Sequence, residues 1–153
     1  MGWALSLCWL YAITKYRYVP SFEEILSAIA DARKLGFQYM ELEGVGVQLH
    51  TVAEHQSEIK RCCEENGVRL IDFVPVLPDI VSTDAQKRGK ALEEFGMGCE
   101  IGAYFETGMV QIDTFHLPVH EEPPYDISRE FRFAYRPPSI RVDPEFDFWE
   151  FFD

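Results

Sequence analysis

The sequence predicts an α/β fold built from parallel βα repeats. Apolar runs typical of strands begin near Trp3, Gln38, Val68 and Met109, and a segment with helical periodicity separates each run from the next. Such alternation predicts a parallel sheet whose strands are joined by crossover helices. The chain has 153 residues, whereas a complete eightfold βα barrel takes roughly 250. We therefore expect one domain over residues 1–153 that forms about half of a (β/α)8 barrel.

The first two helices are predicted from their start and stop signals. Ser21 and Glu24 form a capping box, apolar residues then recur at helical spacing, and Gly36 ends the helix. A second box at Thr51 and Glu54 predicts the next helix, which the Asn66-Gly67 pair (66–67) ends.

A third helix is predicted to begin at Thr83, with Gln86 completing its box, and to stop by Gly108. Its interior carries several glycines. Each costs about 1 kcal/mol relative to alanine, unless it marks a close contact with a neighbouring element. Both interpretations stay open for Gly89, Gly96, Gly98 and Gly102.

The last third of the chain departs from the βα pattern. Residues 114–142 form a long proline-rich segment, which we expect to be a lid over the barrel mouth or, as the alternative, a partner-binding arm. Asp143 and Pro144 then predict a helix over 143–153 that is cut short and carries an aromatic cluster. The cluster and the open edges of a half-barrel predict a homo- or hetero-oligomer.

Composition restricts the class of partner. A formal charge of −12 repels a phosphate backbone, so nucleic acid is not expected as a partner. The apolar opening of the chain is too short to span a bilayer and lacks a signal peptide's basic start, so we interpret it as a buried strand and expect no membrane partner. The four cysteines lack zinc-site spacing and predict buried thiols in a cytoplasmic protein.

Candidate functional residues lie where the strands end, because parallel βα folds collect reactive groups there. Glu41 and Glu43 alternate with apolar residues and so share one side of the second strand. Gln111 and Asp113 share a side of the fourth strand, with His116 just beyond. These groups suit acid/base chemistry and the recognition of sugar hydroxyls. The alternatives are a solvated glutamate near the strand end, and an Asp113 that caps the loop beside a surface His116.

Two further residues are candidates for substrate binding: Tyr16, after the first strand, and His50, in the region after the second. His50 has a structural alternative at the entry of the second helix. No metal ligand is assigned within the chain, because Pro118 prevents the helix that would bring His116 and His120 onto one face. The glycines at 44–46 are too few for a dinucleotide-binding loop.

Residues 3–115, taken in order, resemble the N-terminal half of the sugar phosphate isomerase/epimerase family, which has a xylose-isomerase-like TIM barrel. The motifs that carry the resemblance are LGF leading into MELEG, the segment FVPVLPD, and VQID. The resemblance implies a carbohydrate-metabolism enzyme that uses a divalent metal, Mn²⁺ or Mg²⁺, to move a proton or hydride between adjacent carbons of a sugar or cyclitol. It also implies that the metal ligands lie mainly outside this chain.

Glu43 and the strand-four residues match positions that line the family's sugar pocket. The resemblance implies only a substrate-contact role for these residues. From their own carboxyl chemistry we expect Glu43 and Asp113 to be the catalytic residues once the barrel is complete, and we expect the chain alone to be inactive. The alternatives are a lyase or dehydratase on the same barrel, of the C-glycoside deglycosidase or inosose dehydratase type, and a noncatalytic half-barrel subunit that completes a partner.

Overall fold

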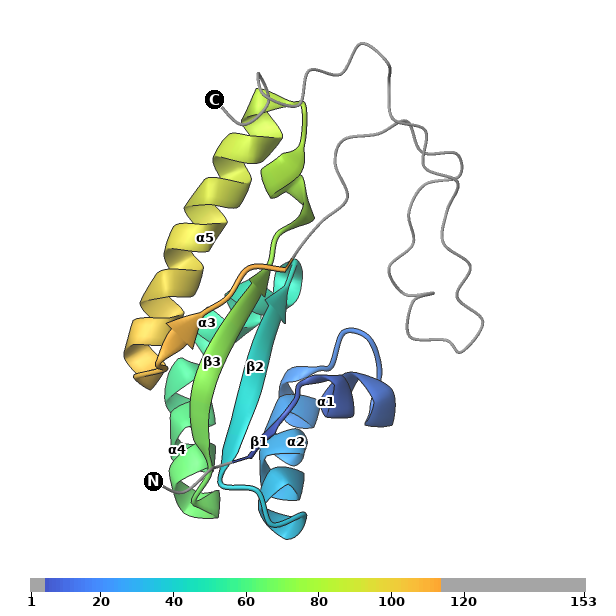
Figure 1. The fold of residues 1–153 in the computed structure, drawn as a ribbon, viewed down its shortest axis with the longest axis vertical. Helices are drawn as coiled ribbons and strands as arrows, with labels where there is room; N and C mark the ends of the chain where they lie inside the picture. Colours follow the sequence, from blue (N-terminus) through green and yellow to red (C-terminus); the bar gives the residue numbers. More distant parts are fainter. Residues whose placement is uncertain (1–4, 114–153) are drawn as a thin grey trace.

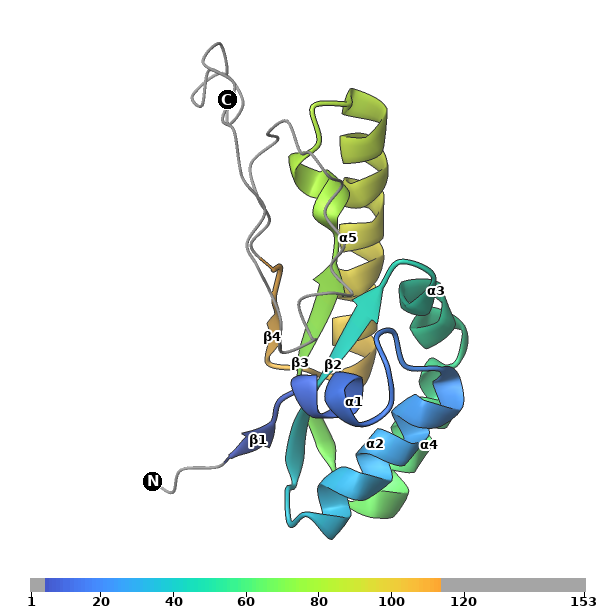
Figure 2. The same cartoon turned by 90° about the vertical axis from the view of Figure 1, so that its right-hand side faces the viewer.

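The computed structural model describes residues 5–113, which form a parallel four-stranded sheet in the order β1-β2-β3-β4. Figure 1 shows the strands side by side, and Figure 2 shows α2, α4 and α5 on the same side of the sheet. The elements in chain order are β1 (Ser6–Leu7), α1 (Leu10–Lys15), α2 (Phe22–Lys34), β2 (Tyr39–Val45), α3 (Val47–Glu54), α4 (Gln56–Asn66), β3 (Arg69–Val76), a 3₁₀ turn (Pro78–Val81), α5 (Ala85–Phe105) and β4 (Met109–Val110).

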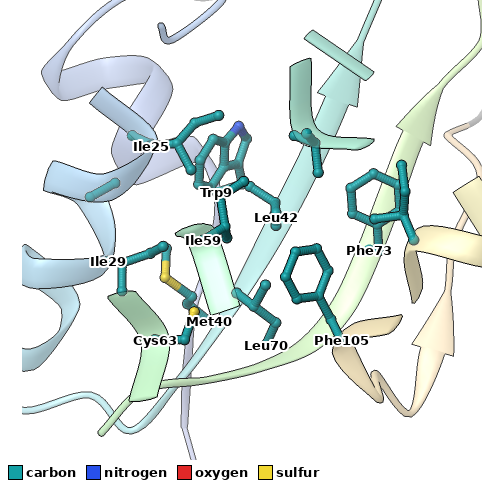
Figure 3. Packing of buried hydrophobic residues seen from close by; sticks show 14 of the residues in the cluster. Trp9, Ile25, Ile29, Met40, Leu42, Ile59, Cys63, Leu70, Phe73 and Phe105 are labelled. Carbon is teal, nitrogen blue, oxygen red and sulfur yellow. The ribbon is translucent and has the colours of Figure 1, made fainter. Parts of the chain in front are cut away.

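The main core lies between the sheet and these helices (Figure 3). Met40 and Leu42 alternate with polar residues along β2, and Ile25 and Ile29 form one stripe on α2; all four are at most 1% exposed. Each such side chain contributes about 2 kcal/mol by leaving water. The apolar periodicities read from the sequence therefore point into one core.

The predicted capping box at the start of α2 is confirmed. The Glu24 amide donates to the Ser21 hydroxyl oxygen at 3.4 Å, and the Ser21 amide donates to the Glu24 carboxylate at 2.7 Å. At the far end Gly36 has a φ of +89°, a left-handed conformation that glycine adopts without strain.

The prediction that the opening apolar run is one strand is wrong for the described residues. Only Ser6–Leu7 pairs with β2, and the chain then turns so that the Ala12 amide donates to the Trp9 carbonyl at 2.9 Å and α1 begins. Trp9 is 1% exposed and fills the core at this turn. A short apolar run carries no periodicity that separates a strand from a buried helix, which is why the sequence missed this break.

The predicted box at Thr51 and Glu54 is also wrong. Thr51 lies inside α3, where its hydroxyl donates to the Val47 carbonyl at 3.3 Å. The helix begins earlier because Gly46, at a φ of +53°, lets the chain turn directly after β2. A break at His55 then separates α3 from α4, which ends at Gly67 as predicted.

The start predicted for α5 is wrong by one residue. Asp84, rather than Thr83, caps the helix, and its carboxylate accepts from the amides of Gln86 at 2.8 Å and Lys87 at 3.4 Å. A carboxylate is favoured there because it also interacts with the positive end of the helix dipole. Gln86 therefore takes part in the cap through its backbone amide, and its side chain does not complete a capping box.

Two of the α5 glycines mark close contacts. A Cβ on Gly98 would lie 2.8 Å from Pro75 Cγ, and one on Gly102 would lie 2.5 Å from Val110 Cγ2. Gly89 and Gly96 face open space. The packing interpretation thus holds for Gly98 and Gly102, which let α5 approach β3 and β4.

The predictions for the cysteines, for a membrane span and for the last third of the chain have different outcomes. All four cysteines are free thiols, but Cys63 alone is fully buried, whereas Cys8 and Cys99 are exposed. Within residues 5–113 no helix is both long and apolar enough to cross a membrane. The predicted lid at 114–142, the helix at 143–153 with its aromatic cluster, and His116 lie outside the described residues.

Candidate functional site

A cavity of about 280 Å³ opens at the carboxyl ends of the strands, where parallel βα folds place their sites. All four strands or the residues directly after them contribute to its wall. The lining residues are Cys8, Leu10, Tyr18, Glu41, Glu43, Asp72, Val74, Val76, Gln111 and Asp113.

The second strand supplies two carboxylates to this cavity. Glu41 and Glu43 face it, while Met40 and Leu42 between them point into the core. The predicted common side of Glu41 and Glu43 is therefore the pocket side. Alternation alone produces this arrangement, since successive side chains of a strand point to opposite faces.

The third strand supplies a third carboxylate through a register irregularity. Met40 pairs with Leu70, but Glu41 pairs with Asp72, so Ile71 is an extra residue on β3. Such a bulge shifts every later side chain to the opposite face from the one that strict alternation gives. Asp72 consequently lines the pocket instead of entering the core.

The fourth strand brings Gln111 and Asp113 to the same cavity. The Gln111 amide donates to the Phe73 carbonyl at 3.0 Å, which ties the segment after β4 to β3. Gln111 and Asp113 therefore lie on the same side of the chain, as predicted. His116, their predicted neighbour, lies outside the described residues.

The pocket favours protonated carboxyl groups. Burial raises the pKa of Glu43 to about 7, with Asp113 and Glu41 adding repulsion. Burial also raises the pKa of Asp113, and burial together with Glu41 raises that of Asp72. No lysine, arginine or histidine occurs among the described lining residues, so these acids have each other as neighbours and no cation.

Glu41 is held in a fixed position. Its Oε2 accepts from the Trp9 amide at 3.2 Å, and the Cys8 thiol also hydrogen-bonds to it. Burial, and then Glu41, raise the pKa of Cys8, so this thiol stays protonated and is a poor nucleophile. Sequence reasoning placed Asp72 among the polar residues at the strand ends but missed Cys8 as a pocket residue.

Two predicted substrate-binding residues do not line the cavity. The Tyr16 hydroxyl donates to Asp31 Oδ2 at 2.5 Å, where α1 packs on α2. His50 lies on α3 with its Nε2 3.8 Å from Glu94 Oε1 on α5. Their role in substrate binding stays a prediction.

Asp31 is surrounded by donors: Lys15 Nζ lies 2.5 Å from its Oδ2, and Tyr11 and Lys34 lie within 3.5 Å. Burial by itself raises the pKa of Asp31, but the hydrogen bonds from Lys15 and Tyr16 hold it at about 2. This cluster fastens α1 to α2.

The described residues do not fit a metal site by themselves. Over residues 5–113, no three His, Cys, Asp or Glu side chains are grouped closely enough to hold a metal ion. The divalent ion implied by the resemblance, with ligands mainly outside this chain, stays a prediction.

The parallel strands, their crossover helices and the pocket at the carboxyl ends define a partial α/β barrel. Neither a protein-family model nor a curated protein sequence matches the chain. A solved structure, that of the probable 3-DHS dehydratase AsbF involved in petrobactin synthesis from Bacillus anthracis, is similar with a TM-score of 0.50 and 18% sequence identity. The match covers 72% of this chain and 38% of that one, so the chain spans well under half of the AsbF length. At this identity the likeness confirms the predicted fold class.

Proposed function

We propose that the chain supplies the acid/base wall of a barrel enzyme that removes water from a small polyhydroxylated molecule. The observation that carries the proposal is the pairing of Glu43 with Asp113 in one pocket at the strand ends, where Glu43 has a pKa of about 7. A carboxyl group with that pKa exchanges protons readily at neutral pH, which general acid/base catalysis requires.

In the proposed reaction Asp113 takes a proton from the carbon beside a carbonyl group. The electrons of that C–H bond form a carbon–carbon double bond, and the hydroxyl on the next carbon leaves. Glu43 donates the proton that converts the departing hydroxyl to water. Two carboxyl groups with different surroundings suit these two roles, because the more strongly perturbed one keeps its proton to a higher pH.

Water elimination is favoured over isomerisation because the fold neighbour is described as a probable dehydratase. An isomerase or epimerase is the second candidate, since the same pair could move a proton between adjacent carbons of a sugar. The third is the noncatalytic half-barrel subunit. The chain spans 38% of AsbF, so any activity is proposed for the completed assembly.

The experiment follows the ¹H NMR signals of an inosose, a ketone of a cyclic polyol, in D₂O with the chain in its completed assembly. Dehydration replaces the signal of the proton on the hydroxyl-bearing carbon with the signals of an unsaturated product. Isomerisation exchanges the α-proton for deuterium without loss of oxygen. Glu43→Gln and Asp113→Asn should each slow the reaction by about 100-fold or more. Glu93→Gln, which removes the same charge at an exposed position of α5, should leave the rate unchanged.

A rate that both pocket variants leave intact would contradict the assignment of Glu43 and Asp113. A completed assembly that exchanges no α-proton would support the noncatalytic subunit instead.

A further inference from the structure

Within the described residues, the wall of the pocket carries four carboxyl groups and no cationic side chain. Glu41 and Glu43 come from β2, Asp72 from β3, and Asp113 from the segment after β4. A carboxylate or phosphate on a ligand would add a further negative charge to this partly buried site. Such like-charge approach is penalised more inside a cavity than in water, because screening is weaker there.

Asp72 lacks a partner at one oxygen. The residue is 4% exposed, and its Oδ1 accepts no hydrogen bond from the residues that the structure describes. A buried acceptor without a donor is costly, and native proteins nearly always satisfy such atoms. Asp72 belongs to the pocket wall, and because its Oδ1 has almost no accessible surface, a group in the pocket supplies the missing donor once the carboxylate rotates toward the cavity.

Glu41 stands next to Asp72 in the sheet register. One Glu41 oxygen, Oε2, already accepts from the Trp9 amide at 3.2 Å, so its carboxylate is fixed in place. Its second oxygen carries a share of the same charge. The two neighbouring acids thus form a preorganised acceptor pair on the β2–β3 side of the pocket, while Asp113 lies on the β4 side.

We infer that this pocket takes a polyol bearing a protonated amine, which donates to Asp72 and Glu41, in preference to one bearing a carboxylate or phosphate. An ammonium group carries three donors, so it can satisfy Asp72 Oδ1 and still reach Glu41. Ionised donor and acceptor groups also form the stronger hydrogen bonds. The inference names the substrate class of the proposed site and in that respect rests on the proposed function.

The test is a titration of the full chain at pH 7 with D-glucosamine, D-glucose and D-glucuronate, which share a sugar ring and differ in charge. Glucosamine should bind at least 10-fold more tightly than glucose, and glucuronate more weakly than glucose. In Asp72→Asn, the affinity for glucosamine should fall to within about 3-fold of that for glucose. Asp79→Asn removes an exposed aspartate outside the pocket wall and should keep the full preference.

The affinities of the unaltered chain for the three ligands test the amine preference even if a variant does not fold. Glucuronate binding as tightly as glucosamine, or no binding of glucosamine, would overturn the inference. An amine preference that survives in Asp72→Asn would overturn the role of Asp72. The readout is binding, so this result is separate from the α-proton exchange that tests the proposed function.

Discussion

Asp31 and Asp72 are both buried aspartates, yet their surroundings differ in opposite senses. Asp31 on α2 accepts from Lys15, Tyr11, Tyr16 and Lys34, and its pKa is held at about 2. Asp72 on β3 has an oxygen without a donor, and its pKa is raised by burial and by Glu41. Asp31 is therefore a charged, hydrogen-bonded carboxylate, whereas the surroundings of Asp72 favour its protonated form.

This difference distinguishes acidic residues that hold the fold together from acidic residues that are available for binding or catalysis. A donor-rich site such as that of Asp31 uses its charge to join two helices. A donor-poor site at the strand ends, such as that of Asp72, favours the binding of protons or cations. Its unsatisfied carboxyl groups lower the stability of the fold unless a ligand pairs with them.

The largest effect concerns the pH dependence that Glu43 imposes on stability. Its pKa rises from 4.5 to about 7 on folding, so the native state binds this proton more tightly than the unfolded state. Stability is therefore highest below pH 4.5 and falls as the pH rises to 7, by up to about 3 kcal/mol from this group. Glu43→Gln should flatten that part of the curve in denaturant unfolding between pH 4.5 and 8, whereas Glu93→Gln should not. A Glu43→Gln curve that parallels the unaltered chain would refute the raised pKa.

The second prediction addresses the paired acid. Asp31→Asn should lower the free energy of unfolding at pH 7 by about 2 kcal/mol, because hydrogen bonds from charged donors are lost. Since the pKa of Asp31 is lowered from 3.8 to about 2, its contribution is present above pH 3.8 and disappears as the pH falls through 2. Urea unfolding measures the loss, with Asp79→Asn as the exposed control. No loss at pH 7 would show that the cluster is only a surface ion pair.

The third prediction has the opposite sign. Asp72→Asn should raise the free energy of unfolding at pH 7 by about 1 kcal/mol, since it removes a buried charge whose Oδ1 has no donor among the described residues. A thermal melt should show an increase of a few degrees. If Asp72→Asn instead destabilises as much as Asp31→Asn, the two acids are both structural and the comparison fails.

The smallest effect is on Cys8. Glu41 contributes to the raised pKa of this thiol, so Glu41→Gln should lower that pKa and increase the thiolate fraction. Alkylation of Cys8 by iodoacetamide at pH 8, followed by mass spectrometry, should be faster in Glu41→Gln than in the unaltered chain. Cys99 is an internal reference whose rate should not change. A Cys8 rate that stays the same would show that Glu41 and the thiol do not interact.

Much of the fold could be predicted because it depends on short-range signals. The Ser21–Glu24 box, the alternation around Glu41 and Glu43, and the common side of Gln111 and Asp113 each involve residues within a few positions of one another. Local rules of this kind survive folding unless a tertiary contact overrides them.

What could not be predicted depends on partners distant in sequence. Cys8 reaches the pocket because the chain turns at Trp9, whose ring is buried against helices that come later. Tyr16 turns to Asp31 on α2 rather than to the cavity, and Asp72 is redirected by a bulge defined by its pairing with β2. None of these contacts leaves a periodic trace in the sequence.

The bulge at Ile71 also has a consequence at the level of the gene. Loss of that single codon would restore strict pairing with β2 and would leave Leu70 and Phe73 on the core side and Asp72 on the cavity side. Loss of a codon after Phe73 would instead exchange the core and cavity positions of the residues that follow it. Deletion scanning of β3 should therefore accept the loss of Ile71 better than the loss of any later codon in the strand.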